Sequence, residues 1–219
     1  MMTDYLALDG IFRSYPTIYS YMDELGLKSI VRRKKPGYTK GTAHKVFPDL
    51  LNQNFSVDAP NKVWVMDFTY LLRPGGATMY NCTIMDLFKR NVVATLNSSR
   101  LNAQLAADTL SIAIKRNTPA KGLILHSDQG SQLTSRAFVE FCAKNYVQQS
   151  MSRAGCPFDN APMERFFNTF KNEFYNLYSF ESVATLNEKT YDFIYVKYNY
   201  LRPHSYNNGI PPAIAMRTA

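Results

Sequence analysis

The stretch that decides the fold is residues 63–72, which read Val63-Trp64-Val65-Met66-Asp67-Phe68-Thr69-Tyr70-Leu71-Leu72. Both faces of this stretch are mostly apolar, a pattern typical of a central strand that is covered on two sides. A carboxylate in such a strand is costly unless it is paired or binds a cation. Asp67 is therefore either half of a structural salt bridge or a candidate cation ligand.

The segments that follow this strand come in a regular order. A turn at residues 74–76 leads to two strands joined by short loops, which indicates an antiparallel meander. The expected elements are strands at 79–85 and 91–96, a helix at 101–116, a strand at 122–125, a helix at 135–145, a strand at 146–149, and helices at 162–178 and 183–200. This order predicts an α/β fold with a mixed five-stranded sheet and helices on both faces.

Two further carboxylates stand near the ends of predicted elements. Asp128 comes just after a short apolar strand, where open α/β sheets place their ligand sites, although a turn aspartate is the alternative. Glu164 lies at the start of a helix, where an acid can also serve only as a favourable cap residue. The start of that helix is marked by Asp159, Asn160 and Pro162.

The helix after residue 162 has an apolar and a polar side. At about 100° per residue, the core-facing side chains fall within about 60° of Met163. These are Phe166, Phe167, Phe170 and Phe174. Glu164, Asn168 and Lys171 lie about 80–140° round the helix and share one polar edge. Glu164 is therefore expected to point along the sheet toward the two aspartates.

Three carboxylates that converge on an apolar sheet repel one another unless a cation lies among them. Oxygen ligands with few histidines favour Mg²⁺ or Mn²⁺ over zinc. Two such ions about 4 Å apart would support in-line phosphoryl transfer, because one activates the attacking oxygen and the other stabilises the leaving oxygen. The carboxylates Asp67, Asp128 and Glu164 are thus the candidate metal site.

The chain of 219 residues has a formal net charge of +8, and part of this excess is local. Residues 28–45 hold seven Lys and Arg side chains and no acid. Such a segment binds nucleic acid through its phosphates, or else is a solvated linker. The residues at its centre are Arg32, Arg33, Lys34 and Lys35.

Several classes of protein are disfavoured. No uncharged stretch is long enough for a membrane helix, and residues 1–10 lack the pattern of a secretory signal. Cys82, Cys142 and Cys156 are an odd number without C-x-x-C spacing, which argues against a disulfide framework and against a zinc knuckle. We expect a cytoplasmic protein, associated with the nucleoid if it binds DNA.

The ordered motifs resemble those of the DDE transposases of the bacterial insertion-sequence-three family, whose catalytic core is similar to retroviral integrase. There are 35 residues between Asp128 and Glu164, the spacing of that family. The matching stretches are WVMDFTY at 64–70, MDLFKR at 85–90, HSDQGSQ at 126–132, SMSRAG at 150–155, DNAPME at 159–164 and YNYLRPHS at 198–205. The resemblance runs from about residue 61 to the end of the chain.

The resemblance implies a ribonuclease-H-like fold and a Mg²⁺-dependent polynucleotidyl transferase. Asp67, Asp128 and Glu164 would be its catalytic, metal-binding triad. Water or a 3′-hydroxyl of DNA would attack a phosphodiester, first to cut the transposon ends and then to join them to new DNA. The DNA contacts implied within this core are Lys171, Asn168, His126 and Arg153.

The N-terminal region is expected to be incomplete as a DNA-binding module. Residues 18–27 predict one amphipathic helix, whereas residues 1–15 match the family poorly. We therefore expect a partial helix-turn-helix remnant and basic linker at 1–46, and a catalytic core with a C-terminal helical extension at 58–219. Expected partners are DNA, further copies of the chain on DNA and an upstream-frame helix-turn-helix protein. A truncated, non-catalytic regulator and a nuclease that cuts without joining are the alternatives.

Four other polar residues have open roles. Asp86 is expected to be a turn residue or a salt-bridge partner, not a fourth ligand. His126 either orients substrate or a ligand carboxylate, or forms a strand-end hydrogen bond to the backbone. Arg202 and His204 either contact DNA or dock the C-terminal segment on the core.

Overall fold

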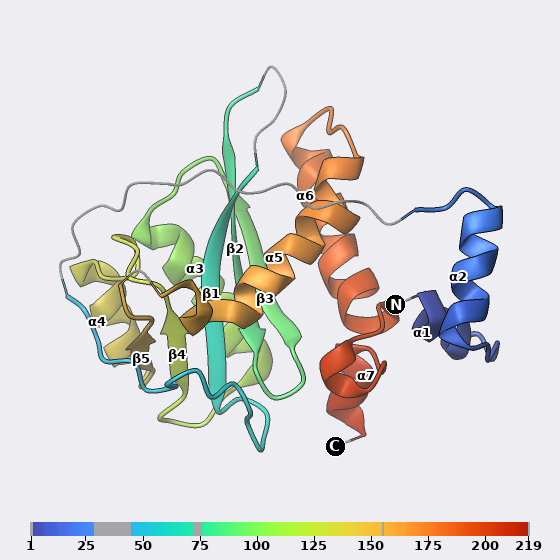
Figure 1. Ribbon diagram of the computed structural model, residues 1–219. Coiled ribbons are helices and arrows are strands. Elements are labelled where there is room, and N and C mark those ends of the chain that lie inside the picture. Colours follow the sequence, from blue (N-terminus) through green and yellow to red (C-terminus); the bar gives the residue numbers. More distant parts are fainter. Residues whose placement is uncertain (1, 29–44, 72–75, 155, 219) are drawn as a thin grey trace.

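A computed structural model describes residues 2–28, 45–71, 76–154 and 156–218. Its centre is a mixed five-stranded sheet in the order β3-β2-β1-β4-β5 (Figure 1). The strands are β1 Val63–Leu71, β2 Met79–Asp86, β3 Asn91–Ser98, β4 Ile124–Ser127 and β5 Gln148–Met151. The first three pair antiparallel and the last two join in parallel, so the predicted α/β topology is confirmed.

The central strand β1 buries both of its faces, as its sequence predicts. Val63, Val65 and Leu71 belong to one apolar cluster, whereas Trp64 and Met66 belong to the other. Successive side chains of a strand point to opposite faces, so odd-numbered positions of β1 share the first face. Asp67 is one of these odd-numbered positions.

Helices cover the two faces of the sheet. α3 Ala103–Asn117 and α4 Arg136–Lys144 supply buried side chains to the cluster that contains Trp64. α5 Ala161–Glu173 and α6 Val183–Tyr191 supply the cluster that contains Val65. α5 is shorter than the predicted 162–178, because Phe174 leaves helical geometry at φ −140° and a 3₁₀ turn, Tyr175–Leu177, follows.

The C-terminal helix is continuous over the predicted range, but its second half is wider than an α-helix. α6 runs directly into a π-helix, Asp192–Leu201. This π-helix lies against the outer strand β3, where the Asn199 side chain accepts from the Val92 N–H and donates to the Val92 carbonyl, both at 3.0 Å. The Tyr195 hydroxyl accepts from the Thr95 N–H at 3.1 Å. The helix therefore caps backbone groups that an edge strand would otherwise expose.

Replacing Asn199 by Leu should lower the free energy of unfolding by about 2 kcal/mol, because it leaves a buried N–H and a buried carbonyl of Val92 without their partners. Chemical denaturation of the two proteins measures the difference. The control is Asn172→Ala, since the Asn172 amide bonds only to the Asn168 carbonyl of its own helix. A loss no larger than that of the control would contradict the capping role.

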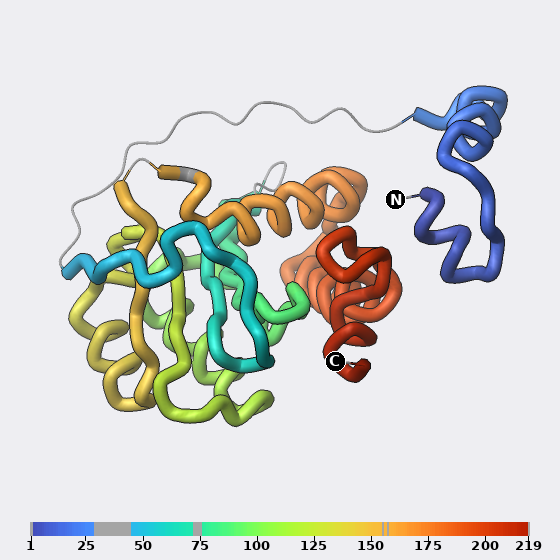
Figure 2. Tube along the Cα trace, turned by 60° about the horizontal axis from the view of Figure 1, so that its bottom comes forward, coloured from blue at the N-terminus to red at the C-terminus, as the bar shows by residue number. Residues whose placement is uncertain are grey.

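The N-terminal region holds two short helices that pack on each other, α1 Met2–Leu8 and α2 Tyr15–Glu24. Figure 2 shows them apart from the sheet, on the side of the C-terminal segment. α2 starts earlier than predicted, because the Ser14 hydroxyl caps the Thr17 N–H. α1 was not predicted. Arg32, Arg33, Lys34 and Lys35 lie outside the described residues.

Part of the segment before residue 58 packs against the sheet. Leu51 is buried in the cluster around Val65, and Phe55 packs against it. The Met151 N–H at the end of β5 donates to the Pro48 carbonyl at 3.2 Å. The segment from Phe47 to Pro60, called the connector below, is therefore attached to the sheet by side-chain packing and by a backbone hydrogen bond. Among the described helices, none is long and apolar enough to cross a membrane.

The short C-terminal helix α7 Pro212–Arg217 packs against the π-helix and β3. The helix predicted at 183–200 is apolar or aromatic nearly all round, so it has to be covered on several sides. Phe193, Ile194 and Tyr198 are buried in the core cluster, so this side packs inside the domain. Val196 and Tyr200 stay exposed.

Candidate active site

Asp67 lies on β1 and points to the face of the sheet that α5 covers. It pairs across the antiparallel ladder with Thr83 of β2 and is partly exposed. The Phe68 N–H donates to its Oδ1 at 2.7 Å. Asp67 thus interrupts a buried strand at a position that remains open to solvent.

Asp128 stands beside Asp67 on the neighbouring parallel strand. Val65 of β1 is paired with His126 of β4, so each aspartate lies two residues beyond a matched pair. Adjacent strands are about 4.8 Å apart, and a two-residue step returns to the same face. The two aspartates are therefore neighbours, with Asp67 in the middle of β1 and Asp128 just beyond the C-terminal end of β4.

The turn after β4 holds the Asp128 side chain. The Gly130 N–H donates to Asp128 Oδ1 at 2.9 Å, which closes an Asx-type turn. A Cβ atom on Gly130 would come within 2.9 Å of the same oxygen. A side chain at Gly130 would therefore require the Asp128 carboxylate to shift from this position. Asp128 is therefore a turn residue, and it also lies just beyond the end of a strand.

Glu164 approaches the same face of the sheet from α5. The predicted apolar side of this helix is confirmed, because Met163, Phe166, Phe167 and Phe170 are buried in the cluster around Val65. Glu164 itself is exposed in the first turn. In the described parts of the chain, no three His, Cys, Asp or Glu side chains stand close enough to share one metal ion. Glu164 thus faces the same side of the sheet as the aspartates without forming a closed ligand cluster with them.

His126 is a buried connection between β4, β5 and the turn before α5. Its side chain has 0% exposure. Nδ1 lies 2.8 Å from the Ser150 hydroxyl, and Nε2 lies 2.9 Å from the Asp159 carbonyl. The carbonyl can only accept, so we assign the ring proton to Nε2. The expected strand-end hydrogen bond of His126 to the backbone is confirmed. The expectation that His126 contacts DNA is wrong, because a fully buried ring cannot reach DNA directly.

The pKa of His126 is lowered, chiefly because burial disfavours the charged ring. Asp49 approaches Nδ1 at 3.9 Å but opposes this shift only in part. A neutral ring at neutral pH matches its hydrogen bonds, because the imidazolium would have no acceptor role toward Ser150. His126 therefore has a structural role, since its hydrogen bonds hold the turn before α5 against β4 and β5.

Asp159 links three segments of the chain. The sequence pattern identified it only as a residue that marks the start of a helix. Its side chain is buried and accepts from the Arg153 N–H at 2.9 Å, the Arg153 guanidinium at 3.1 Å and the Gln53 amide at 2.7 Å. These contacts, Arg153 first and Gln53 second, hold the pKa of Asp159 far below its ordinary value. Asp159 therefore ties the connector, the strand end of β5 and the start of α5 together.

This depressed pKa makes a pH-dependent prediction. The stability that Asp159 contributes is complete above the pKa of an unfolded aspartate and is lost as the pH falls below it. In Asp159→Asn we expect a lower Tm at pH 7, with a gap to the wild type that narrows toward pH 3. Thermal unfolding at several pH values measures this, with Asp108→Asn on the exposed side of α3 as the control. A constant gap across this range would contradict the assignment.

The open roles of Asp86 and Arg202 are resolved by their contacts. Asp86 is fully buried, and its two oxygens accept from the Asn61 and Phe88 N–H groups at 2.7 and 2.9 Å, so it is a turn residue as expected. Burial raises its pKa. Arg202 forms a two-bond ion pair with Glu173 of α5, both bonds at 2.7 Å, and so docks the C-terminal segment on the core.

The remaining predicted DNA contacts are placed as follows. Asn168 and Lys171 are half-buried along the same edge of α5 as Glu164. The Arg153 side chain is 60% exposed, although its guanidinium is bound to Asp159. These three positions remain predictions for DNA contact.

Comparisons with known proteins agree with this geometry. Two models described as integrase core domain match the chain, one over residues 57–157 and the other over residues 145–212. The transposase for insertion sequence element IS904 of Lactococcus lactis subsp. lactis (strain IL1403) is 37% identical over 205 residues, which cover 93% of this chain and 81% of that protein. Transposase InsF for insertion sequence IS3A of Escherichia coli (strain K12) is 32% identical over 212 residues, or 96% of this chain and 73% of that protein.

Solved structures share the fold at low identity. The catalytic core domain of HTLV-2 integrase in complex with magnesium matches with a TM-score of 0.55 at 18% identity, over 72% of this chain and 97% of that one. A chain of the simian T-cell lymphotropic virus intasome matches with a TM-score of 0.62 at 15% identity, over 84% of this chain and 61% of that one. The fold is thus the ribonuclease-H-like fold of integrase cores. The chain belongs to the IS3 family of DDE transposases, and it carries the integrase-type catalytic domain that acts in DNA transposition.

Proposed function

We propose that this chain is a metal-dependent DNA strand transferase that cuts transposon ends and joins them to target DNA, with Asp67, Asp128 and Glu164 as its catalytic residues. The observation that carries the proposal is the pairing of Val65 with His126, which makes Asp67 and Asp128 neighbours on parallel strands. Glu164 comes to the same face on α5. Two fixed carboxylates and one on the first turn of a helix suit a reaction on a phosphodiester.

The donor set fits hard divalent cations. Asp67, Asp128 and Glu164 offer only carboxylate oxygens, which favour Mg²⁺, with Mn²⁺ as a substitute, over softer metals. Two bound ions would supply activation of the attacking oxygen and stabilisation of the leaving oxygen. The magnesium in the HTLV-2 integrase core supports the same kind of ion here.

The surrounding residues would hold this face in place and guide DNA to it. His126 and Asp159 fix the start of α5 on β4 and β5, and so set the direction from which Glu164 reaches the aspartates. Asn168 and Lys171 continue the edge of α5 beyond Glu164 and are suited to contact the DNA end, and the exposed Arg153 is suited to contact it from the end of β5. The segment with Arg32, Arg33, Lys34 and Lys35 would bind phosphates without sequence preference.

Assembly and location are part of the proposal. Two transposon ends must be cut and joined together, which favours several copies of the chain on DNA, as the intasome assembly of the viral relative illustrates. An upstream-frame helix-turn-helix protein would take part in recognition of the transposon ends. Action on chromosomal DNA implies a cytoplasmic, nucleoid-associated protein.

The test is a nicking and joining assay on a branched DNA that carries a free 3′-hydroxyl, with Mg²⁺ or Mn²⁺ and with EDTA as the negative control. A branched substrate lowers the need for end recognition. Metal-dependent joined products support the proposal. Nicked products without joined ones would identify a nuclease, and no products from a folded, DNA-binding chain would favour the regulatory alternative.

A further inference from the structure

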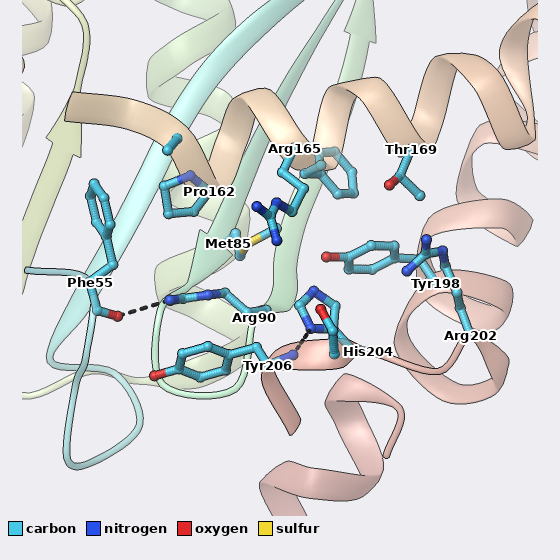
Figure 3. A pocket seen from close by; sticks show the side chains of 13 residues that line it. Phe55, Met85, Arg90, Pro162, Arg165, Thr169, Tyr198, Arg202, His204 and Tyr206 are labelled. Carbon is cyan, nitrogen blue, oxygen red and sulfur yellow. Dashed lines mark hydrogen bonds between the residues drawn. The ribbon is translucent and has the colours of Figure 1, made fainter. Parts of the chain in front are cut away.

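A cavity of about 470 Å³ lies beside α5, on the flank opposite Glu164. Ala161, Arg165 and Thr169 of α5 line it, and of these Arg165 and Thr169 stand about 100° or more round the helix from Glu164 and Lys171. Its other walls come from Phe55, from Met85 of β2, from Arg90 in the turn between β2 and β3, and from the C-terminal segment that contains the YNYLRPHS motif (Figure 3). The cavity is therefore distinct from the carboxylate site but shares a helix with it.

The cavity wall carries positive charge without a matching acid. Arg90, Arg165 and Arg202 line it, and none of its lining residues in the described chain is Asp or Glu. Arg202 is compensated by Glu173 from outside the wall. Arg90 donates to the neutral carbonyls of Leu87 and Phe55, at 2.6 and 3.0 Å, and the buried Asp86 outside the wall offsets its charge in part. Two guanidinium charges on this wall thus lack an ion-pair partner, since in the described chain Arg165 forms no ion pair.

The remaining polar groups of the wall are hydrogen-bond donors. The Tyr206 N–H donates to Nδ1 of His204 at 3.2 Å, so a neutral ring carries its proton on Nε2. Burial, helped by the three arginines, lowers the pKa of His204 to about 4, which keeps the ring neutral at pH 7. The Thr169 and Ser205 hydroxyls add two more donors. A wall that offers several donors and carries three guanidinium groups is complementary to an anion with several acceptor oxygens.

We propose that this cavity binds a phosphodiester of the DNA strand that leaves the carboxylate site across the N-terminal half of α5. The inference rests on the proposed function, because that function brings a DNA strand to Glu164. Glu164 and Arg165 are consecutive residues about 100° apart round α5, so a strand that reaches Glu164 has to extend by no more than the width of the helix, about 10 Å, to reach the cavity. Arginine is the residue best suited to phosphate, because its planar donors match two oxygens at once.

Aromatic side chains favour a nucleic-acid strand over a free phosphate ion. The Tyr206 ring stacks on the Arg90 guanidinium at 3.9 Å, and its hydroxyl end reaches the rim of the cavity (Figure 3). Phe55 lies beyond the guanidinium end of Arg90, which donates to the Phe55 carbonyl (Figure 3). Aromatic rings beside a basic groove stack on the bases of single strands without sequence preference. The cavity thus offers a place for a phosphate and an apolar rim for the attached nucleoside.

The test compares binding of a fluorescein-labelled single-stranded 12-mer DNA by the full chain and by Arg165→Gln, measured by anisotropy over a range of salt. We expect about a tenfold loss of affinity and a salt slope lower by about 0.7 unit, the value for one phosphate contact on single-stranded DNA. Arg165→Lys should recover the slope, because it keeps the charge. Arg136→Gln is the matched control, since Arg136 is exposed, is paired with Glu140 on α4 and lies outside the cavity.

Equal losses in Arg165→Gln and Arg136→Gln would overturn the proposal, since only general charge would then matter. Ser205→Glu, which places an acid on the exposed rim, should weaken binding at least as much. Titration with inorganic phosphate gives the second arm, and phosphate binding without any change in DNA affinity would also overturn it. The nicking assay stays separate. If nicking depends on Glu164 but Arg165→Gln binds DNA as tightly as the wild type, the cavity proposal is rejected and the strand transferase is kept. If Arg165→Gln loses DNA affinity but the wild type gives no metal-dependent products, the strand transferase is rejected and the cavity proposal is kept.

Discussion

In Glu164→Gln, nicking and joining of the branched DNA are expected to fall by about 10³-fold or more, while DNA affinity stays nearly unchanged. The glutamine keeps the shape of the side chain but removes the negative charge that a divalent cation requires. Asp67 and Asp128 would remain as neighbours on β1 and β4. The third carboxylate is therefore the one whose loss should separate chemistry from folding most cleanly.

The exposed position of Glu164 makes this separation measurable. Glu164 lies in the first turn of α5 with its side chain exposed, so its replacement should change the free energy of unfolding by less than about 0.5 kcal/mol. Glu188→Gln on the exposed side of α6 makes the same chemical change away from the site and should retain full activity. Nicking that survives in Glu164→Gln would move the third catalytic acid to another residue.

The topology could be predicted because it depends on local patterns. Apolar residues on both faces of β1 identify a central strand, and the short loops after it allow only antiparallel neighbours. The apolar side of α5 follows from the spacing of Met163, Phe166 and Phe170, and these residues are buried as expected. Whole elements with a clear period were therefore found, including the one that carries Glu164.

The ends of β4 and β5 were placed about two residues too early, because polar residues stand in the C-terminal halves of both strands. β4 ends at His126 and Ser127, and β5 includes Ser150. These side chains are buried through their bonds to one another, such as His126 to Ser150 at 2.8 Å. A search for apolar runs assigns such residues to loops, since their partners lie on a different strand.

The contacts that hold the site together were not visible in the sequence, because they join residues far apart in the chain. Gln53 binds Asp159 across 106 positions, and Asn199 binds Val92 across 107. Glu173 was not singled out, although it fixes Arg202 to α5. Helix starts and turn residues carry local signals, whereas the partner of a buried polar group is decided by the fold.

Replacing Arg32, Arg33, Lys34 and Lys35 together by Gln should flatten the salt dependence of DNA binding by about three to four units of slope, because each lost phosphate contact removes about 0.9 unit on duplex DNA. A fourfold rise in salt would then cost the wild type about 100-fold more affinity than it costs the variant. Anisotropy with a labelled duplex at 50 and 200 mM salt measures both quantities.

The control removes the same number of charges from exposed positions of the core, at Lys115, Lys121, Lys144 and Lys189. Both variants lose four positive charges, so any general effect of net charge on association is equal in the two. Only lost phosphate contacts can make their salt slopes differ, because the slope counts the counterions that binding releases. A basic segment that merely links the N-terminal helices to the core would leave its variant with the slope of the control.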